Sequence, residues 1–371
     1  DYQEGAVRDD FDFGGLWLVR GDLLRQFAAD NKQRYKYAAS YALRLYLSRH
    51  GDLVHLREPL YTEQETDLRR SGEKQFDYVN PAAREVQIEM ERACTSHLKA
   101  VGAWLAPDEY DDVPLREEDQ ALLQITSLPI STAQTEATGE LPSEVSSFPV
   151  VASVIIPVRN RVRTIGDAIQ SALSQETNFT FNVIVVDNHS TDGTDEVVRR
   201  FAQDERVVLL QPDRTDLGIG GCWDYAIRSN FCGRYAVQLD SDDLYSGTDT
   251  LARIVEAFVK QRAAMVIGSY RMVNFNLETL PPGLIDHREW TPDNGRNNAL
   301  RINGLGAPRA FDTAVLREIG FPNTSYGEDY ALGLAISRRF RIARIYDELY
   351  LCRRWEGNSR SEEHTSELQS L

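Results

Sequence analysis

Residues 153–158 read Ser-Val-Ile-Ile-Pro-Val, residues 183–187 read Val-Ile-Val-Val-Asp, and residues 235–240 read Tyr-Ala-Val-Gln-Leu-Asp. Each stretch is a short apolar run, rich in β-branched residues and closed by polar ones, which is typical of a buried parallel strand. In an open α/β sheet the carboxyl ends of such strands meet at one edge, and ligands bind there. These stretches therefore predict an α/β domain with its functional site at that edge.

An acidic cluster closes the third stretch, with Asp240, Ser241, Asp242 and Asp243 in succession. Carboxylate oxygens are hard ligands that suit Mg²⁺ or Mn²⁺, so we expect Asp240 and Asp242 to hold such a cation. The alternative interpretation is that these acids only cap a helix or form a solvated turn. The order of the three strands along the chain favours the metal site.

With this order of strands and acidic residues, the stretch from about Phe148 to Ser359 resembles the glycosyltransferases of family 2. The resemblance implies the GT-A fold, a Rossmann-like and mostly parallel central sheet with flanking helices. It also implies a nucleotide-sugar donor, most commonly a UDP-sugar, and a glycan or lipid-linked saccharide as acceptor. A Mg²⁺ or Mn²⁺ ion would bridge the two phosphates of the donor.

The resemblance assigns donor binding to residues near the ends of the strands. In such enzymes a proline and a polar pair lie along the nucleotide, an acid accepts a hydrogen bond from the nucleobase, and arginines contact the diphosphate. The donor-binding residues that it implies here are Pro157, Arg159, Asn160, Asp187, Asp240, Arg353, Arg354 and Trp355. The alternative for the two C-terminal arginines is a solvated basic pair beside a buried tryptophan.

Two loops of the same region have more ordinary interpretations. Asp192 is expected to be a turn or N-cap residue before a helix that begins near Thr194. Further along, Gly218, Gly220 and Gly221 precede another expected helix. These glycines either expose backbone amides to a phosphate or simply form a turn, and the sequence favours neither.

Glu328 and Asp329 open an expected helix in the stretch Tyr-Gly-Glu-Asp-Tyr-Ala-Leu-Gly-Leu. One interpretation is that the two acids only interact favourably with the helix dipole. The resemblance implies that Asp329 is the general base that deprotonates the acceptor hydroxyl, with Glu328 beside it, and that the anomeric carbon is inverted. Selection of the acceptor is expected from the Pro-, Asp- and Asn-rich region 278–298.

The N-terminal part of the chain repeats a segment of the C-terminal part. Residues 37–49 match residues 326–338 without a gap, and Ala39 and Ser40 take the places of the acidic pair. A repeat of this length predicts that residues 1–62 are the closing part of another GT-A-like domain, without the aligned base. Three nearby acids are expected to be solvated loop charges, namely Asp9, Asp10 and Asp12.

The remaining segments complete the expected organisation. Apolar residues recur at helical spacing between residues 82 and 105, which predicts a helix. A polar stretch follows, and the last residues read like a translated sequencing adapter. The expected order is a remnant at 1–62, a helical connector at 63–106, a polar linker at 107–147, a glycosyltransferase domain at 148–359 and a non-native tail at 360–371.

Composition limits the expected partners and compartment. The chain has 371 residues and a formal net charge of −16, which disfavours nucleic acid as a partner. No apolar run approaches the ~20 residues of a membrane span. Four cysteines without metal-ligand spacing suggest a reducing compartment. We therefore expect a cytoplasmic protein at the inner face of the membrane, with peripheral membrane association through its acceptor.

The function expected from these patterns is that of an inverting glycosyltransferase. One alternative is a catalytically inactive module that binds glycans or nucleotides, which would share the same fold. Another is a nucleotidyltransferase, which would need a glycine-rich loop with a lysine after the first strand. The sequence at 159–161 is Arg-Asn-Arg instead, so the glycosyltransferase is favoured.

Overall fold

The fold is known from a computed structural model that describes residues 5–9, 13–62, 84–111, 113, 122, 148–302 and 304–354. The described residues fall into two compact units. Unit 1 comprises residues up to Glu109 together with Arg288–Gly304, and unit 2 comprises Tyr110–His287 and Leu305–Ser359. Most of the predicted linker at 107–147, the tail at 360–371 and Trp355 lie outside the described residues, so those predictions stay predictions.

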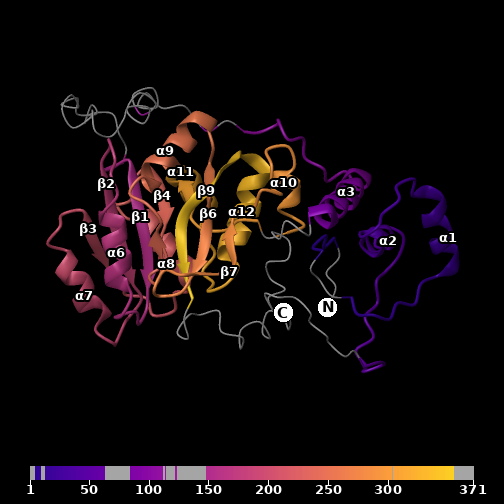
Figure 1. The fold of residues 1–371 in the computed structure, drawn as a ribbon, viewed down its shortest axis with the longest axis horizontal. Coiled ribbons are helices and arrows are strands. Elements are labelled where there is room, and N and C mark those ends of the chain that lie inside the picture. Colours follow the sequence, from indigo (N-terminus) through magenta and orange to yellow (C-terminus); the bar gives the residue numbers. More distant parts are fainter. Residues whose placement is uncertain are drawn as a thin grey trace. The chain divides into compact units, whose positions relative to one another are not determined.

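A nine-stranded sheet forms the centre of unit 2 within the described residues, in the order β3-β2-β1-β4-β8-β6-β9-β5, with β7 paired to β6 (Figure 1). Its strands are β1 Ala152–Val158, β2 Phe181–Asp187, β3 Val207–Leu210, β4 Tyr235–Gln238, β5 Leu244–Tyr245, β6 Met265–Val273, β7 Thr279–Ile285, β8 Arg309–Asp312 and β9 Ile342–Arg353. The three predicted strands are β1, β2 and β4, and their side chains are almost entirely buried.

The predicted parallel arrangement is confirmed for one half of the sheet. Strand β1 lies between β2 and β4 and is parallel to both, and β2 is parallel to β3. Val158 pairs with Asp187, and Ile155 pairs with Gln238, so the carboxyl ends of these strands lie at one edge. The other half is mixed, because β8 is antiparallel to β4 and to β6, whereas β9 is parallel to β6.

Helices flank this sheet, as the resemblance implies. In α6 the buried residues Ile165, Ala168, Ile169 and Ala172 recur at the spacing of one helical face. The helices of unit 2 are α6 Ile165–Leu173, α7 Thr194–Phe201, α8 Ile219–Arg228, α9 Thr250–Gln261, α11 Thr313–Ile319 and α12 Glu328–Arg339. Helix α6 packs on α7, whereas α8 packs on α11 and α12.

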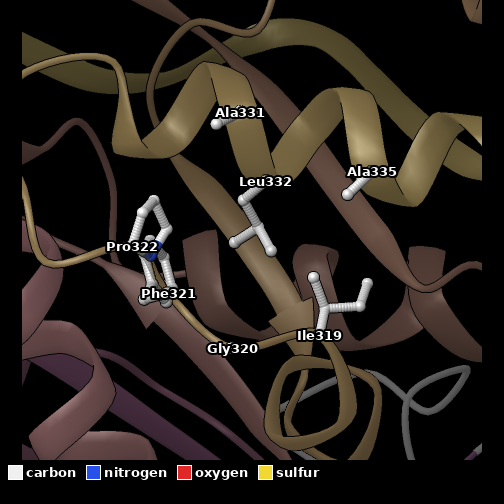
Figure 2. Close-up of a pocket in the computed structure, with 7 residues that line it drawn as sticks. All are labelled: Ile319, Gly320, Phe321, Pro322, Ala331, Leu332 and Ala335. Atoms are coloured by element: carbon white, nitrogen blue, oxygen red, sulfur yellow. The ribbon is translucent and has the colours of Figure 1, made fainter.

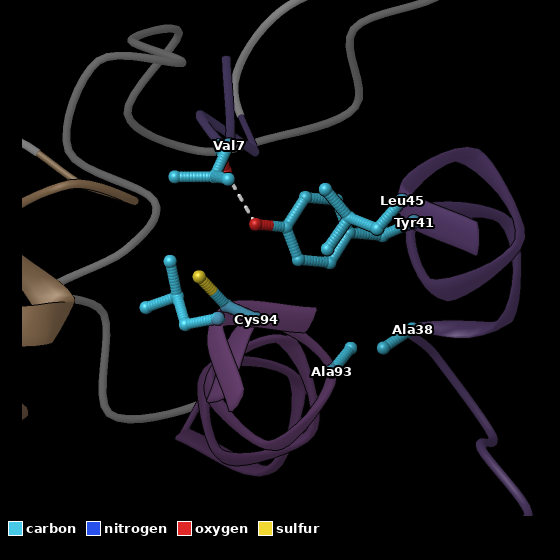
Figure 3. Close-up of a cluster of buried hydrophobic side chains, with 7 residues drawn as sticks. Val7, Ala38, Tyr41, Leu45, Ala93 and Cys94 are labelled. Carbon is cyan, nitrogen blue, oxygen red and sulfur yellow. Dashed lines mark hydrogen bonds between the residues drawn. The ribbon is translucent and has the colours of Figure 1, made fainter. Parts of the chain in front are cut away.

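Unit 1 contains α1 Gly21–Asp30, α2 Ala39–Leu47, α3 Arg84–Ala100 and α10 Gly295–Asn298. The helix predicted between residues 82 and 105 is confirmed as α3. A buried cluster from three segments holds the unit together, and Figure 3 shows the Tyr41 hydroxyl donating to the carbonyl oxygen of Val7 beside Cys94. Burial raises the pKa of the Cys94 thiol to about 11.

The repeated segments have corresponding helices. Helix α2 begins at Ala39, the residue aligned with Glu328 at the start of α12. In α2 the aligned carboxylates are absent, and Glu89 of α3 takes their place by accepting hydrogen bonds from the amides of Lys36, Tyr37 and Ala38. Among residues 13–62 the structure contains helices and no strand, so the remnant has no sheet of its own there.

One expectation about a loop is wrong. Asp9 is not a solvated loop charge, because its carboxylate pairs with the guanidinium of Arg301, which is 0% exposed. Asp10 and Asp12 lie outside the described residues. The region 278–298 contains β7 and α10, and its part from Arg288 onward belongs to unit 1, while its role in selecting the acceptor stays a prediction.

None of the helices that the structure describes is long and apolar enough to cross a membrane.

Candidate active site

The loops that follow β1 and β2 are bound to each other. The amide of Asn160 donates to Ser190 Oγ at 2.9 Å, and the amide of Thr191 donates to Asn160 Oδ1 at 2.8 Å. Pro157 is part of β1, and Arg159 is exposed in the loop that follows. The structure thus places the predicted residues of this loop beside the carboxyl end of β2.

Asp192 is a turn residue, as predicted. Its Oδ1 accepts a hydrogen bond from the amide of Thr194 at 3.0 Å, and its Oδ2 accepts one from the amide of Val162 at 3.1 Å. These bonds lower the pKa of Asp192, although burial opposes them as the largest single effect. Helix α7 begins at Thr194, so the predicted helix start is also confirmed.

Asp187 closes β2 and is buried, with 2% of its surface exposed. Its Oδ1 accepts from the amide of Ser190 at 3.0 Å, and its Oδ2 accepts from Gln211 Nε2 at 3.2 Å. Gln211 follows β3 and was not among the predicted site residues, because no motif surrounds it. Together the two side chains present a carboxylate and an amide at the sheet edge, a pair that can read a nucleobase.

The acidic loop after β4 is held firmly by β9. The amide of Asp240 donates to the hydroxyl of Tyr350 at 3.0 Å, and Asp243 accepts from the amide of Arg353 at 2.7 Å. Asp243 is fully enclosed. Burial raises the pKa of its carboxyl well above the usual range, and the charges of Asp240 and Asp242 raise it further. Asp243 therefore supports the acidic loop.

The two predicted arginines of β9 lie at the end of that strand and just beyond it. Arg353 is 2% exposed, and its guanidinium donates to the carbonyl oxygen of Asp242 and to Asp167 Oδ2. The structure thus shows Arg353 supporting the acidic loop, while its contact with a diphosphate stays a prediction. Arg354 is half-buried, and its amide donates to the carbonyl of Val273 at 2.8 Å. The predicted contact of Arg354 with the donor also stays a prediction.

A divalent cation fits the acidic loop. Within the described residues no group of three or more Asp, Glu, His or Cys side chains is placed to hold a metal, so the protein would supply only Asp240 and Asp242. Mg²⁺ is commonly bound by one or two carboxylates with substrate phosphates and water. The mutual repulsion that raises the pKa of Asp243 shows that these carboxylates are crowded, which a cation would relieve.

Arg161 is a further cation at this edge that the motifs did not single out. Its Nε lies 3.9 Å from Asp242 Oδ2, and its side chain is 23% exposed. An arginine beside the acidic loop suits a ligand with negative charge of its own, such as a diphosphate.

Glu328 and Asp329 lie in the first turn of α12, after Gly327, whose φ of 74° is in the left-handed region. Burial, then the charge of Asp329 and to a smaller extent that of Asp240, raises the pKa of Glu328 to about 7. Hydrogen bonds through Gln238 and Arg309 also join Asp240 to Asp329, so the two acidic signatures, far apart along the chain, lie near each other in the fold.

Arg309 was missed by the sequence reasoning. It opens β8, its side chain is 12% exposed, and its guanidinium forms an ion pair with Asp329 Oδ2. The only hint in the sequence is its place after the glycine- and proline-containing run at 304–308. The predicted base is thus held by an arginine from a strand that the sequence analysis did not predict.

The glycines at the start of α8, Gly218 at its N-cap and Gly220 and Gly221 in its first turn, serve close packing. The amide of Gly218 donates to Asn323 Oδ1 at 2.8 Å, and the amide of Gly220 donates to the carbonyl of Thr324 at 3.0 Å. A Cβ on Gly220 would lie 2.0 Å from the carbonyl oxygen of Pro322. Because the chain itself occupies these amides, the structure supports packing on the segment that leads to α12 rather than a phosphate cradle.

An apolar depression of about 350 Å³ lies beside the same segment. Figure 2 shows Ala331, Leu332 and Ala335 of α12 on one side of the depression, and the end of α11 with the chain after it on the other. Ile319 of α11 and the following Gly320, Phe321 and Pro322 complete the lining. None of the predicted site residues lines this depression.

Comparison with known proteins identifies the same part of the chain. Residues 153–319 match the family model for glycosyl transferase family 2. An uncharacterized glycosyltransferase of Rickettsia conorii is 28% identical over 202 residues, 53% of this chain and 32% of the relative. The poly(ribitol-phosphate) beta-N-acetylglucosaminyltransferase TarS of Staphylococcus aureus is 27% identical over 219 residues, 58% of this chain and 36% of the relative. The chain thus spans about a third of the length of these relatives.

Two solved structures resemble part of the chain. The crystal structure of residues 1–349 of S. aureus TarS in complex with UDP-GlcNAc has a TM-score of 0.47 and 23% identity, and covers 56% of this chain and 60% of that one. Glucosyl-3-phosphoglycerate synthase from Mycobacterium tuberculosis, in complex with Mn²⁺, UDP-glucose and phosphoglyceric acid, has a TM-score of 0.43 and 18% identity, with 64% and 77% covered.

The family model begins in β1 and extends over β2, β4 and the acidic loop, the elements that meet at one edge of the sheet. Residues 153–319 therefore form a domain of glycosyl transferase family 2.

Proposed function

We propose that this chain is a metal-dependent, inverting glycosyltransferase that moves a sugar from a nucleoside diphosphate, with UDP as the expected nucleotide, to a glycan or a lipid-linked saccharide. The observation that carries the proposal is the hydrogen-bonded link between two acidic signatures at the edge of a family 2 domain, in which Gln238 and Arg309 join Asp240 after β4 to Asp329 on α12. A donor site and an acceptor base must lie side by side for transfer to occur.

The donor side of the proposal rests on the loops after β1, β2 and β4. Asp187 with Gln211 would bind the nucleobase, and Pro157 with the loop of Arg159 and Asn160 would lie along the nucleotide. The cation at Asp240 and Asp242 would be Mg²⁺ or Mn²⁺, and when bound it supplies charge that stabilises the departing diphosphate. Arg161 lies close enough to Asp242 to add a second positive charge.

The acceptor side rests on Asp329. Its carboxylate takes the proton of the acceptor hydroxyl while the acceptor oxygen forms a bond to the anomeric carbon. The bond from that carbon to the diphosphate oxygen breaks in the same displacement, and the nucleoside diphosphate leaves with the bonding electrons. Because the attack and the departure take place on opposite faces of the sugar, the configuration at the anomeric carbon is inverted.

The proposal also covers the cellular compartment of the reaction and the domain organisation of the chain. All four cysteines are free, three of them buried, which fits a reducing compartment such as the cytoplasm. The corresponding starts of α2 and α12 support the interpretation of residues 1–62 as the closing part of a second GT-A-like domain. A lipid-linked acceptor would bring the protein to the inner face of the membrane.

The proposal is tested by incubating the full chain with UDP- and GDP-sugars and Mn²⁺ and measuring nucleotide release. UDP-GlcNAc comes first, because TarS is named for N-acetylglucosaminyl transfer. We expect metal-dependent release that falls at least about 100-fold in Asp242→Asn and in Asp329→Asn. Asp347→Asn, which alters an exposed carboxylate of β9, is the matched control and should retain activity.

Nucleotide binding without turnover on any donor or acceptor would instead identify a binding module. Release of pyrophosphate from a nucleoside triphosphate and a sugar phosphate would identify a nucleotidyltransferase.

A further inference from the structure

A continuous chain of hydrogen bonds joins the acidic loop to the predicted base. Gln238 Nε2 donates to Asp240 Oδ1 at 2.9 Å. Gln238 Oε1 in turn accepts from Arg309 Nη1 at 2.7 Å, and Arg309 Nη2 donates to Asp329 Oδ2. Two side chains therefore span the distance between the carboxylates of the donor side and the acceptor side.

The sheet places these two side chains next to each other. Strands β4 and β8 are antiparallel, with Val237 opposite Ala310, so Gln238 and Arg309 are the adjacent pair along the ladder. The amide of Arg309 also donates to Gln238 Oε1, at 3.2 Å. The link is thus built on rigid strands rather than on the loops that carry the acids.

The chemistry of the link leaves little freedom in its orientation. Arg309 donates through Nε to the carbonyl of Leu305 at 2.7 Å, so all three nitrogens of its guanidinium are engaged. Arginine has no acceptor, so the amide of Gln238 must turn its oxygen toward Arg309 and its nitrogen toward Asp240. Gln238 is 6% exposed, and a buried network of this kind holds its members in one arrangement.

We propose that Arg309 and Gln238 are positioning residues that hold the base carboxylate of Asp329 at a fixed distance and orientation from the donor-binding carboxylate of Asp240. This inference rests on the proposed function. Neither residue touches the reacting atoms. Their effect is to hold the hydroxyl-activating carboxylate at the correct distance from the anomeric carbon, where an error of 1 Å costs about 100-fold in rate.

The test uses the full chain and the sugar donor that it turns over, with Arg309→Lys and Gln238→Met as variants. Lysine keeps the positive charge but cannot span three acceptors, and methionine keeps the length of glutamine without its hydrogen bonds. We expect kcat to fall at least about tenfold in both variants, while the KM for the donor stays within about threefold of the parent value.

Arg317→Lys is the matched control. Arg317 of α11 also binds two acceptors through its guanidinium, the carbonyls of Ile227 and Ser229, but it lies outside the proposed site. We expect its kcat to equal that of the parent. Thermal unfolding of all variants, measured with and without UDP, shows whether each one is folded and binds nucleotide at the assay temperature.

The outcomes separate this inference from the proposed function. A parent that turns over donor, with variants that keep kcat within about threefold, overturns the inference and leaves the proposed function intact. The inference is also overturned if the variants lose UDP binding and stability without a selective fall in kcat. A parent that turns over no donor overturns the proposed function and the inference with it.

Discussion

Glu328 and Asp329 are neighbours in sequence but differ in their surroundings. Asp329 faces the guanidinium of Arg309, whereas Glu328 is partly enclosed near the start of α8, and a Cβ on Gly220 would lie 3.0 Å from its Cβ. Burial and then the charge of Asp329 raise the pKa of Glu328 to about 7, so the carboxyl of Glu328 is close to its titration midpoint at neutral pH.

The raised pKa of Glu328 predicts a pH-dependent stability. A carboxyl with a folded pKa of about 7 and an ordinary value of 4.5 favours the folded state fully below pH 4.5. That contribution is lost as the pH rises through 7. Glu328→Gln removes the cost of the buried charge, so at pH 8 it should raise the free energy of unfolding, relative to the parent, by on the order of 2 kcal/mol.

Urea unfolding between pH 5 and pH 8 measures this difference. Glu256 of α9, which is half-buried and pairs with Lys260, is changed to Gln as the control and should show a constant offset. A constant offset for Glu328→Gln as well would contradict the assignment of the raised pKa to this residue.

The residues of the candidate site were predictable from the sequence only where a motif carries them. Asp187, Asp240, Asp242 and Glu328 with Asp329 stand in recognisable runs, and the structure links Asp240 to Asp329 through two side chains. Gln211, Gln238 and Arg309 stand in no motif, because their contacts depend on which strands become neighbours. That order, with β8 between β4 and β6, is set by packing of the whole sheet rather than by local sequence.

At the scale of elements, the sequence predicted where strands lie and where helices begin better than it predicted what a segment packs against. The apolar runs of β1, β2 and β4 and the starts of α7 and α12 follow from local patterns. The packing role of the glycines at the start of α8 does not follow from a local pattern. Their packing partner, the segment Pro322–Ser325, lies about a hundred residues further along the chain, and nothing local indicates it.

Two glycine substitutions in helices should therefore have opposite effects. In Gly220→Ala the new Cβ would meet the backbone oxygen of Pro322, so we expect a loss of about 2 kcal/mol or more. In Gly166→Ala, within α6, the nearest atoms are side-chain carbons at 3.6 Å and beyond. We expect that substitution to stabilise the protein by up to about 1 kcal/mol.

Denaturant midpoints of the two variants and the parent provide the measurement. Equal stability of Gly220→Ala and the parent would mean that the segment at 322–325 does not press on α8 as described. A destabilised Gly166→Ala would show that helical glycines are costly to replace in this protein for another reason.

At the scale of the whole molecule, unit 1 is completed by Arg288–Gly304, a segment from the last part of the family 2 match at 153–319. Asn297 exchanges hydrogen bonds with the backbone of Leu105, and Arg296 donates to the carbonyl of Ala106. Arg301 binds Gln87 as well as Asp9. The segment 288–304 therefore depends on residues that precede the domain in sequence.

This dependence predicts the behaviour of fragments. Compared with the full chain, a fragment of residues 148–371 lacks every partner of α10 in the range 84–109, so backbone amides at 295–302 should lose protection from hydrogen exchange. A fragment of residues 84–371 should keep much of that protection. Mass spectrometry of peptides over 295–302 makes the comparison, with the buried strand β1 as the internal control. Equal protection in all three chains would mean that α10 is stable without unit 1.

Unit 1 cannot be completed until its segment 288–304 has been synthesised. Residues up to Glu109 leave the ribosome before Arg301, which emerges only after β1 to β7 have been made. Until then the guanidinium of Arg301 that pairs with Asp9 in the folded protein is missing, and the cluster around Tyr41 and Cys94 lacks Leu300 beside it. Unit 1 is thus completed only after most strands of unit 2 have been translated, and a chaperone that binds nascent chains would find its target there.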